Sequence, residues 1–210
     1  MHQFFEEDER CINCGELLED FRRLLGLNQD LLCISCRRKL EGGIRTVTVQ
    51  GLQVTYLYQY DEELRSLLYR FKGVGDIRVA PVFLYPYHAK LKKRYHSHLC
   101  VRMPSWHEDD ERRGFNHVEE LFRGIGKNMI CPFRKIAPHK QALQTKRNRT
   151  TIESVIQLNS QDRWHEMEEK HILFIDDVMT TGATLHHCAA LLKQQQAEVL
   201  VAGIHPLLSK

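Results

Sequence analysis

The sequence predicts an α/β protein in which a small N-terminal module precedes a doubly wound parallel sheet. From residue 44 onward, short apolar runs alternate with amphipathic stretches of helical periodicity, the order typical of a sheet covered by helices. Upstream of residue 44, four cysteines form two closely spaced pairs. These two observations divide the chain into a module of residues 1–42 and an α/β domain of residues 43–210.

Composition limits the classes of protein that the chain can represent. Hydrophobic residues make up 42% and charged residues 27%, which is typical of a globular protein in water. No apolar run approaches the roughly 20 residues that cross a bilayer, so we expect no membrane insertion. Residues 1–8 are acidic where a signal peptide would be basic, and this favours a cytoplasmic location.

Basic residues are concentrated in three places, although the net charge is only +3. The clusters are residues 37–39, 90–94 and 140–149. Such clusters suit phosphate-rich partners, single-stranded DNA among them, and ordinary solvated surface is the alternative.

The cysteine pairs predict a zinc site. Cys11-x-x-Cys14 and Cys33-x-x-Cys36 are separated by 18 residues, a spacing that can supply four thiolates to one tetrahedral zinc ion. The segment between the pairs is too short for a core of its own, so metal binding would provide much of its folding energy. Disulfides and a redox-active pair are the alternatives. The other three cysteines, at positions 100, 131 and 188, lie in apolar stretches and are expected in the core.

The first half of the α/β domain predicts a hairpin and two helices. Residues 44–60 alternate in polarity around Gly51, which indicates a β-hairpin. Asp61 is placed to cap a helix whose apolar positions are Leu64, Leu67, Leu68 and Phe71, and that helix ends in a basic, glycine-rich corner at 70–76. Residues 81–94 are expected to form one further helix.

The middle of the domain predicts shorter elements. Residues 99–103 form an apolar strand that Pro104 stops, and a helix with an apolar face follows at 118–125. Strands are expected at 133–137, 155–158 and 199–204. The basic stretch 140–149 has no apolar periodicity, so we interpret it as a loop or the start of a helix.

A strand, an acidic pair and a hydroxyl-rich turn follow one another between residues 172 and 184. Ile172–Ile175 is a continuous apolar run, the mark of a parallel strand buried on both faces. Asp176 and Asp177 follow where that strand should leave the sheet, and three threonines then surround Gly182. A helical pattern continues with one apolar face made of Leu185, Cys188, Leu191 and Leu192.

This order of residues predicts an anion site. The first backbone N–H groups of a helix lack partners within it, and the helix dipole adds positive potential there. Gly182 lets the backbone approach an anion closely, and threonine hydroxyls can donate to its oxygens. Carboxylates beside a phosphate make sense if they hold sugar hydroxyls, with or without a divalent cation. The alternative is a glycine turn beside two solvated aspartates.

All 13 positions from 172 to 184 resemble the ribose-phosphate site of type I phosphoribosyltransferases. The resemblance implies that the loop binds the 5-phosphate of phosphoribosyl pyrophosphate (PRPP) or ribose 5-phosphate. It also implies that Asp176 and Asp177, the catalytic pair, hold the ribose hydroxyls, and that Mg²⁺ bridges ribose and pyrophosphate. The phosphate-binding residues would be Val178, Met179, Thr180, Thr181, Gly182, Ala183 and Thr184.

Pyrophosphate would need further cationic donors. Arg113, with Arg112 or Lys72, is the best candidate, because a guanidinium can contact phosphate oxygens bidentately. The alternative for the two arginines is an exposed surface position.

The whole series of motifs is similar to the ComF family of competence proteins, which join a four-cysteine zinc module to a phosphoribosyltransferase domain. The resemblance extends over nearly the whole chain. It is carried by the two cysteine pairs, Phe71-Lys72-Gly73, Arg113-Gly114-Phe115-Asn116, Gln141 before basic residues, and Asp176–Thr184. The resemblance implies a role in natural competence, the uptake of single-stranded DNA during transformation. Single-stranded DNA and the competence DNA translocase or helicase would then be partners.

The chain also departs from that family at four positions. Arg149 fits a family arginine, but Ile152 replaces the asparagine that follows it, and Val155-Ile156 replaces a small-aromatic pair. His117 replaces the glutamine after Arg-Gly-Phe-Asn. These changes leave the phosphate loop intact and affect the acceptor side of the site.

Three functions therefore stay open. The first is a competence factor, and the second is an enzyme that transfers phosphoribosyl to a base or another acceptor. The third is a non-catalytic sensor or scaffold that binds a metabolite.

Overall fold

A computed structural model describes residues 10–18, 30–136, 155–159, 171–193 and 197–209. The expected basic loop at 140–149, with Gln141 and the family positions 149 and 152, lies outside the described residues. The helices are α2 (Ile34–Lys39), α3 (Glu62–Leu68), η2 (Tyr69–Val74), η3 (Ile77–Val79), α4 (Ala80–Leu84), α5 (His88–Tyr95), α6 (His107–Arg113), α7 (His117–Leu121), α9 (Ala183–Leu191) and η6 (Pro206–Leu208). The strands are β1 (Gly42–Val49), β2 (Leu52–Gln59), β3 (Leu99–Arg102), β4 (Asn128–Ile130), β5 (Phe133–Lys135), β6 (Ile156–Leu158), β7 (Ile172–Met179) and β8 (Glu198–Ile204).

A six-stranded sheet forms the centre of the described structure. Its strand order is β1-β2-β8-β7-β3-β4, and all neighbours are parallel except β1 and β2, which are antiparallel. The expected α/β class with a parallel sheet is therefore confirmed, with one antiparallel edge strand. The edge strand arises because a two-residue turn, with both Gln50 and Gly51 at positive φ, can only reverse the chain.

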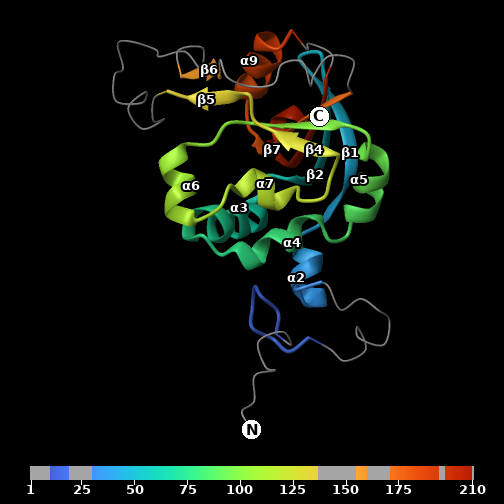
Figure 1. Ribbon diagram of the computed structural model, residues 1–210. Helices are drawn as coiled ribbons and strands as arrows, with labels where there is room; N and C mark the ends of the chain where they lie inside the picture. Colours follow the sequence, from blue (N-terminus) through green and yellow to red (C-terminus); the bar gives the residue numbers. More distant parts are fainter. Residues whose placement is uncertain (1–9, 19–29, 137–154, 160–170, 194–196, 210) are drawn as a thin grey trace.

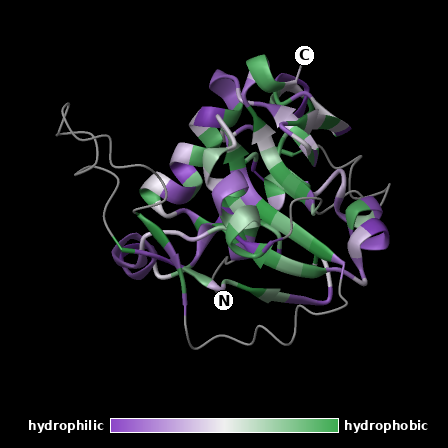
Figure 2. Ribbon diagram, turned by 90° about the horizontal axis from the view of Figure 1, so that it is seen from above, coloured by the Kyte–Doolittle hydropathy of each residue, from purple (hydrophilic) through white to green (hydrophobic). Residues whose placement is uncertain are grey.

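Two hydrophobic cores cover the two faces of this sheet. One contains Leu173 and Ile175 of β7 with side chains of α3, η2, α4, α5 and α7, and the other contains Ile172 and Phe174 with side chains of α9. The layers are visible in Figure 1, and Figure 2 shows hydrophobic strands between helices of mixed character. Because successive side chains point to opposite faces, burial on both sides explains the continuous apolar run at 172–175.

The expected helix at 81–94 is wrong as one element. Pro86 has no N–H and its ring would clash with the carbonyl of Val82, so the chain breaks into α4 and α5. The carbonyl groups freed by the break are bonded from elsewhere. Arg37 of α2 donates to the Val82 carbonyl at 3.0 Å, and the Tyr58 hydroxyl donates to the Phe83 carbonyl at 2.9 Å.

The helix expected after Asp61 is confirmed in its cap and apolar face, whereas the helix expected at 118–125 ends at Leu121, although its four apolar positions are buried. The Asp61 side chain accepts from the Leu64 amide at 2.9 Å, and the four apolar positions after it are buried. In α9, Leu185 and Cys188 are buried. Cys100 is also buried, whereas Cys131 is only half-buried.

A separate two-stranded antiparallel sheet, β5 with β6, lies beside α9. His187 of α9 contacts the Ile156 carbonyl of β6 at 3.1 Å and joins the two parts. Among the described helices, none is long and apolar enough to cross a membrane.

Candidate functional site

The connections that follow β3 and β7 leave the sheet on opposite faces and create a crevice at its carboxyl edge. The chain after β3 enters α6 and α7 on one face, whereas the chain after β7 enters α9 on the other. Such a switch point is where open α/β sheets bind ligands. A cleft of about 770 Å³ lies there. Its walls include Lys72, Met103, Pro104, Trp106, Arg113, His117, Asp176, Asp177 and Thr184.

Asp177 lies at the bottom of this cleft and meets two basic side chains. It follows Ile175 by two positions and therefore faces the same side of the sheet, where η2 and α7 lie. Lys72 of η2 donates its Nζ hydrogen to Asp177 Oδ2. His117 Nε2 of α7 lies 3.7 Å from the same oxygen. The Asp177 side chain is 8% exposed and that of Lys72 is 38% exposed, so the ion pair is buried at one end and open to the cleft at the other.

The two adjacent carboxylates have opposite pKa shifts. Burial would raise the pKa of Asp177, but the charge of Lys72 and the contact with His117 outweigh it and lower the pKa to about 2. Burial and the negative charge of Asp177 raise the pKa of Asp176 well above its usual range. Burial also lowers the pKa of His117 to about 4, against the opposing effect of Asp177. At neutral pH the site therefore has a neutral imidazole beside an ion pair.

The position of the carboxylates differs from the sequence-based expectation in two respects. Asp176 and Asp177 lie within β7, which continues to Met179, rather than after it. Strand β3 ends at Arg102, opposite Ile175, while β8 stays paired with β7 through Met179. The carboxylates therefore lie where β7 loses one neighbour, and Asp177 is buried instead of solvated.

The loop after β7 turns at Gly182 into helix α9. Gly182 has φ of 78° and caps α9, and a Cβ there would approach the Met179 methyl group to 2.4 Å. Thr180 and Thr181 are exposed, and the Ala183 amide donates to the Thr181 hydroxyl at 3.3 Å. Val178 and Thr184 line the cleft. Met179 does not, because its side chain is buried in the core.

Arg112 and Arg113 occupy different environments. Arg112 is 69% exposed and pairs with Asp109 at 3.0 Å. Arg113 is 7% exposed, donates to Asp110 at 2.6 Å and to the Lys72 carbonyl at 3.2 Å. Only its Nε lacks a partner among the described residues. Arg113 therefore holds η2 against α6, and its Nε is buried rather than presented to the cleft.

The other residues of Arg113-Gly114-Phe115-Asn116 position the same corner. Gly114 has φ of 78° and ends α6, and Phe115 stacks on Phe71 at 5.4 Å between ring centroids. Asn116 accepts from the Glu119 amide at 3.0 Å as the cap of α7 and donates to Asp110 at 2.7 Å. The motif thus fixes the side of the cleft from which Lys72 and His117 project.

Sequence reasoning did not assign His117, Trp106 or Lys135 to the site, although all three line the cleft. His117 was visible only as a departure from a family glutamine. The sequence feature that could have pointed to His117 was its place directly after the helix cap Asn116, as the first residue of α7. Trp106 belongs to a segment without a recognisable pattern, and Lys135 belongs to the expected strand at 133–137, which nothing in the sequence placed beside the cleft.

The four predicted zinc ligands come together outside the cleft, in the segments that precede β1. The sulfur atoms of Cys11, Cys14, Cys33 and Cys36 all lie within 4.8 Å of one another. Cys14 and Cys33 have Sγ atoms 3.7 Å apart. Tetrahedral zinc with bonds of about 2.3 Å separates sulfurs by about 3.8 Å, so the cluster fits a zinc ion.

The chemistry of the cluster also favours a cation. Burial raises the pKa of Cys33 to about 12, and it raises the pKa of Cys36. Backbone N–H groups offset burial at Cys11 and lower its pKa to about 7. Four thiolates cannot share such a site without a positive ion to hold them.

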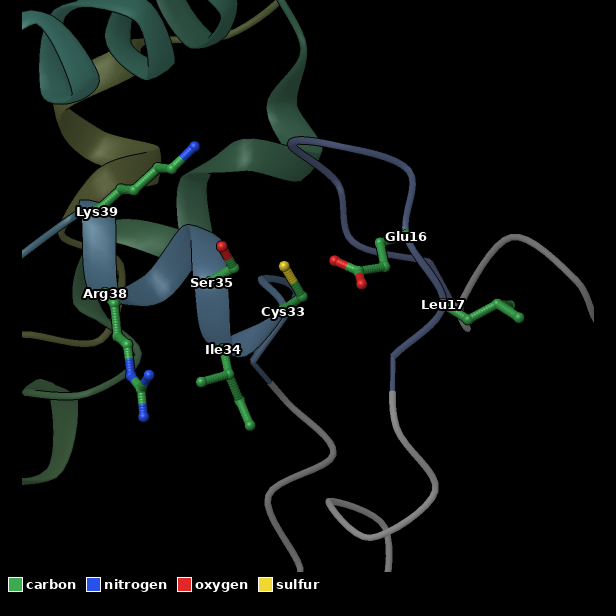
Figure 3. A pocket seen from close by; sticks show the side chains of 7 residues that line it. All are labelled: Glu16, Leu17, Cys33, Ile34, Ser35, Arg38 and Lys39. Carbon is green, nitrogen blue, oxygen red and sulfur yellow. The ribbon is translucent and has the colours of Figure 1, made fainter.

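A pocket of about 530 Å³ lies beside this cluster, between the segment of Glu16 and Leu17 and helix α2 (Figure 3). The Glu16 carboxylate points across it toward Cys33 and Ser35, and Arg38 and Lys39 lie at its α2 side. It is separate from the cleft at β7.

The comparisons with known proteins agree with the motifs. No protein-family model matches the chain. Competence protein ComFC of Bacillus subtilis (strain 168) is 28% identical over 141 residues, which are 66% of this chain and 57% of that protein. Competence protein ComFC of Streptococcus pneumoniae (strain ATCC BAA-255 / R6) is 25% identical over 191 residues, which are 91% of this chain and 77% of that protein. The chain thus spans little more than half the length of the first relative.

A solved hypoxanthine phosphoribosyltransferase from Staphylococcus aureus is 14% identical, with 83% of this chain and 74% of that chain covered. Its TM-score of 0.33 is too low to carry an argument. The two ComFC relatives and the four-cysteine cluster therefore confirm the resemblance of this chain to the ComF family of competence proteins.

Proposed function

We propose that the chain binds PRPP or ribose 5-phosphate in the cleft at β7 and uses this site in natural competence, during the uptake of single-stranded DNA. The observation that supports the ligand best is that Asp177, which is buried, and Asp176 line one cleft together with Val178 and Thr184, which lie on either side of the glycine-capped turn. Ribose 5-phosphate has hydroxyl groups that the carboxylates can bind and, at its other end, a phosphate that the loop can bind. Similarity to two ComFC proteins supports the biological role.

Each wall of the cleft has a distinct task in this proposal. Asp176 and Asp177 accept hydrogen bonds from the ribose hydroxyls, and the loop 180–184 donates to the 5-phosphate. Lys72 holds Asp177 in its charged form and has an exposed end that can turn toward pyrophosphate. Arg112 is exposed at the rim for the same group. Mg²⁺, when bound, would neutralise charge between ribose and pyrophosphate.

The proposed partners follow from the basic surface and from the relatives. Lys90, Lys92 and Lys93 are exposed on α5, and they can neutralise DNA phosphates. We place the protein in the cytoplasm, where single-stranded DNA enters, with the competence DNA translocase or helicase as a further partner.

Calorimetric titration of the zinc-loaded protein with PRPP and Mg²⁺, and separately with ribose 5-phosphate, tests the ligand. We expect binding that is lost in the double variant Asp176→Asn and Asp177→Asn. Asp109→Asn is a matched control, because it removes an exposed carboxylate at the rim of the cleft. Wild-type protein that binds neither ligand would refute the proposed site.

Transformation assays connect the site to competence. The double variant should be expressed and should lose transformation. Normal transformation in a variant without ligand binding would separate the site from the biological role. For DNA contact, affinity for single strands should fall as salt rises, and reversal of charge at Lys146 and Arg147, outside the described residues, should reduce that slope. An unchanged slope would argue against contact there.

Transfer of phosphoribosyl to an acceptor is a second candidate function. The cleft continues beyond the carboxylates to Pro104 and Trp106, which leaves space beside the ribose for a second molecule. In such a reaction the bond from ribose C1 to pyrophosphate breaks and the acceptor forms a new bond to C1. Release of pyrophosphate in the presence of candidate acceptors, measured by mass spectrometry, distinguishes transfer from binding by a sensor or scaffold.

A further inference from the structure

We infer that Arg70 is a positioning residue that couples the four-cysteine cluster to the cleft at β7, so that zinc in the cluster raises the affinity of the cleft for its ligand. The ligand named in this inference rests on the proposed function. The coupling itself rests on a chain of contacts through η2.

Helix η2 contacts both sites through side chains two positions apart. Arg70 Nη1 donates to the carbonyl of Ile12, between the ligands Cys11 and Cys14. Lys72 Nζ donates to Asp177 in the cleft. The element is a short π-helix of six residues, a form that is frequent at functional sites. A displacement of one side chain is therefore transmitted over a very short path to the other.

The position of the Ile12 carbonyl depends on closure of the cysteine cluster. The Ile12 amide donates to the Leu31 carbonyl at 2.9 Å, and Asn13 Nδ2 lies 3.5 Å from the sulfur of Cys36. Both contacts join the first cysteine pair to the second. When zinc is removed, the thiols lose the ion that holds the pairs together, and the acceptor for Arg70 becomes free to move.

The remaining contacts of Arg70 close η2 into a rigid unit. Its Nε and Nη2 donate to Asp76 Oδ2 at 2.9 and 2.7 Å, and the Asp76 amide donates back to the Arg70 carbonyl at 3.2 Å. Arg113 holds the Lys72 carbonyl from the other side at 3.2 Å. Among the described residues, the bond that Arg70 makes outside this unit goes to the Ile12 carbonyl, and the bond that Lys72 makes outside it goes to Asp177.

The direction of the coupling follows from charge. Lys72 is the cation closest to Asp177, and Asp177 and Asp176 are adjacent carboxylates in a partly buried site. If Lys72 withdraws, the carboxylates repel each other without compensation, and their charged forms, which ribose hydroxyls require, become less favourable. The zinc-loaded cluster therefore favours the binding-competent cleft.

A thermodynamic cycle tests this inference. Affinity for ribose 5-phosphate is measured with and without zinc, in wild type and in Arg70→Met, which keeps the side-chain length and removes the guanidinium. Coupling between two sites typically changes affinity by about 5–150-fold, and we expect zinc removal to weaken wild-type binding by that order. The zinc-loaded Arg70→Met protein should bind as weakly as zinc-free wild type, with no further loss on zinc removal. Equal losses on zinc removal in both proteins would overturn the coupling through Arg70.

Two comparisons separate positioning from a general effect on stability. Arg65→Met, on the exposed face of α3, removes an arginine whose ion pair among the described residues is with Glu62 at 3.7 Å, and this variant should retain the full effect of zinc on affinity. Arg70→Lys should keep part of the effect of zinc on ligand affinity, because a lysine can still donate to the Ile12 carbonyl. By reciprocity, ribose 5-phosphate should raise zinc affinity by the same factor in wild type and not in Arg70→Met.

A measurement without any ligand keeps the two proposals distinct. Amide hydrogen exchange of residues 69–76 should speed up on zinc removal in wild type and should already be fast in zinc-loaded Arg70→Met. If wild type binds no ribose ligand but shows this pattern, the proposed function fails and the coupling stands. If the amide exchange rates of residues 69–76 do not change on zinc removal, the coupling is overturned even if the ligand binds.

Discussion

The cysteine cluster and the cleft at β7 both bring together groups that repel one another, and they differ in what offsets the repulsion. In the cleft, the protein supplies the counter-charge itself, since Lys72 pairs with Asp177 and a six-stranded sheet supports both. In the cluster, four sulfurs meet beside a single six-residue helix, and a metal ion held by them would supply the positive charge. The comparison indicates that the cleft is preformed, whereas the cluster depends on what it binds.

Removal of one zinc ligand should produce the largest effect. Structural zinc contributes about 10–16 kcal/mol of binding free energy in zinc-finger peptides, so Cys33→Ser should abolish stoichiometric zinc and expose the module to proteases. Metal analysis and limited proteolysis measure this. Cys131→Ser, a half-buried cysteine outside the cluster, should keep one zinc per chain. A metal-free wild-type module that resists protease without a disulfide would contradict the dependence on metal.

Separate neutralisation of the two cleft carboxylates should give opposite changes in stability. Asp177→Asn leaves Lys72 without its counter-ion and should lower the unfolding free energy by about 1–3 kcal/mol. This is less than the roughly 3–5 kcal/mol of a fully buried pair, because Lys72 is partly exposed. Asp176→Asn removes the carboxylate whose charged form is disfavoured and should leave stability equal or higher. Urea unfolding measures both.

The same two variants should share a loss of ligand affinity. A hydrogen bond to a charged group contributes about 1.5–3 kcal/mol, so each variant should lose roughly one to two decades and the pair two to four. Equal stability changes in the two variants would contradict the burial of Asp177 beside Lys72. Unchanged ligand affinity in both variants would show that the two carboxylates do not bind the ribose.

Acid should weaken the cleft through His117 before it affects Asp177. The pKa of His117 is lowered from 6.5 to about 4 by burial, so the unfolded chain binds a proton in this interval that the folded chain rejects. The unfolding free energy should therefore fall by roughly 3 kcal/mol as pH drops from 6.5 to about 4. Protonation of Asp177, whose pKa is lowered from 3.8 to about 2, reduces the unfolding free energy only as pH falls through that interval.

His117→Gln isolates this contribution. Asp176, whose pKa is raised, takes up a proton in the folded state and acts in the opposite direction, so the difference between variant and wild type is the informative quantity. Urea midpoints at about pH 7 and about pH 4.5 should diverge less in the variant than in wild type. Parallel profiles would show that the imidazole is not buried as a neutral group.

The smallest effect is expected at the exposed rim of the cleft. Arg112→Ala removes a solvated arginine and should change stability by no more than about 0.5 kcal/mol. If Arg112 contacts pyrophosphate, PRPP affinity should fall while ribose 5-phosphate affinity stays the same. Titration with both ligands makes this comparison. Equal losses of affinity for the two ligands would show that Arg112 does not contact pyrophosphate specifically.

Features that depend on neighbouring residues were predictable from the sequence. The hairpin around Gly51, the cap at Asp61 and the buried run 172–175 each arise from local backbone preferences and periodicity. The cysteine cluster was predictable because its two pairs have a spacing that metal geometry demands. Pro86 was available in the sequence as a helix breaker, and the single helix expected at 81–94 overlooked it.

The partners of charged residues depended on the tertiary structure. Lys72 and Asp177 are 105 positions apart, and Arg70 and Ile12 are 58 apart, so no local pattern relates them. Arg113 looked like a free phosphate donor in the sequence, but folding buries it against Asp110 and the Lys72 carbonyl.

The sequence by itself therefore determined the class of the fold, the four cysteines of the cluster and the glycine turn that opens α9. These follow from residue types, short spacings and periodicity, which act over a few positions. Only the tertiary structure decided which carboxylate pairs with Lys72, which arginine is exposed and how Arg70 reaches the carbonyl of Ile12. Burial and charge pairing depend on distance in space, and the parallel sheet brings η2, α7 and β7 together from remote parts of the chain.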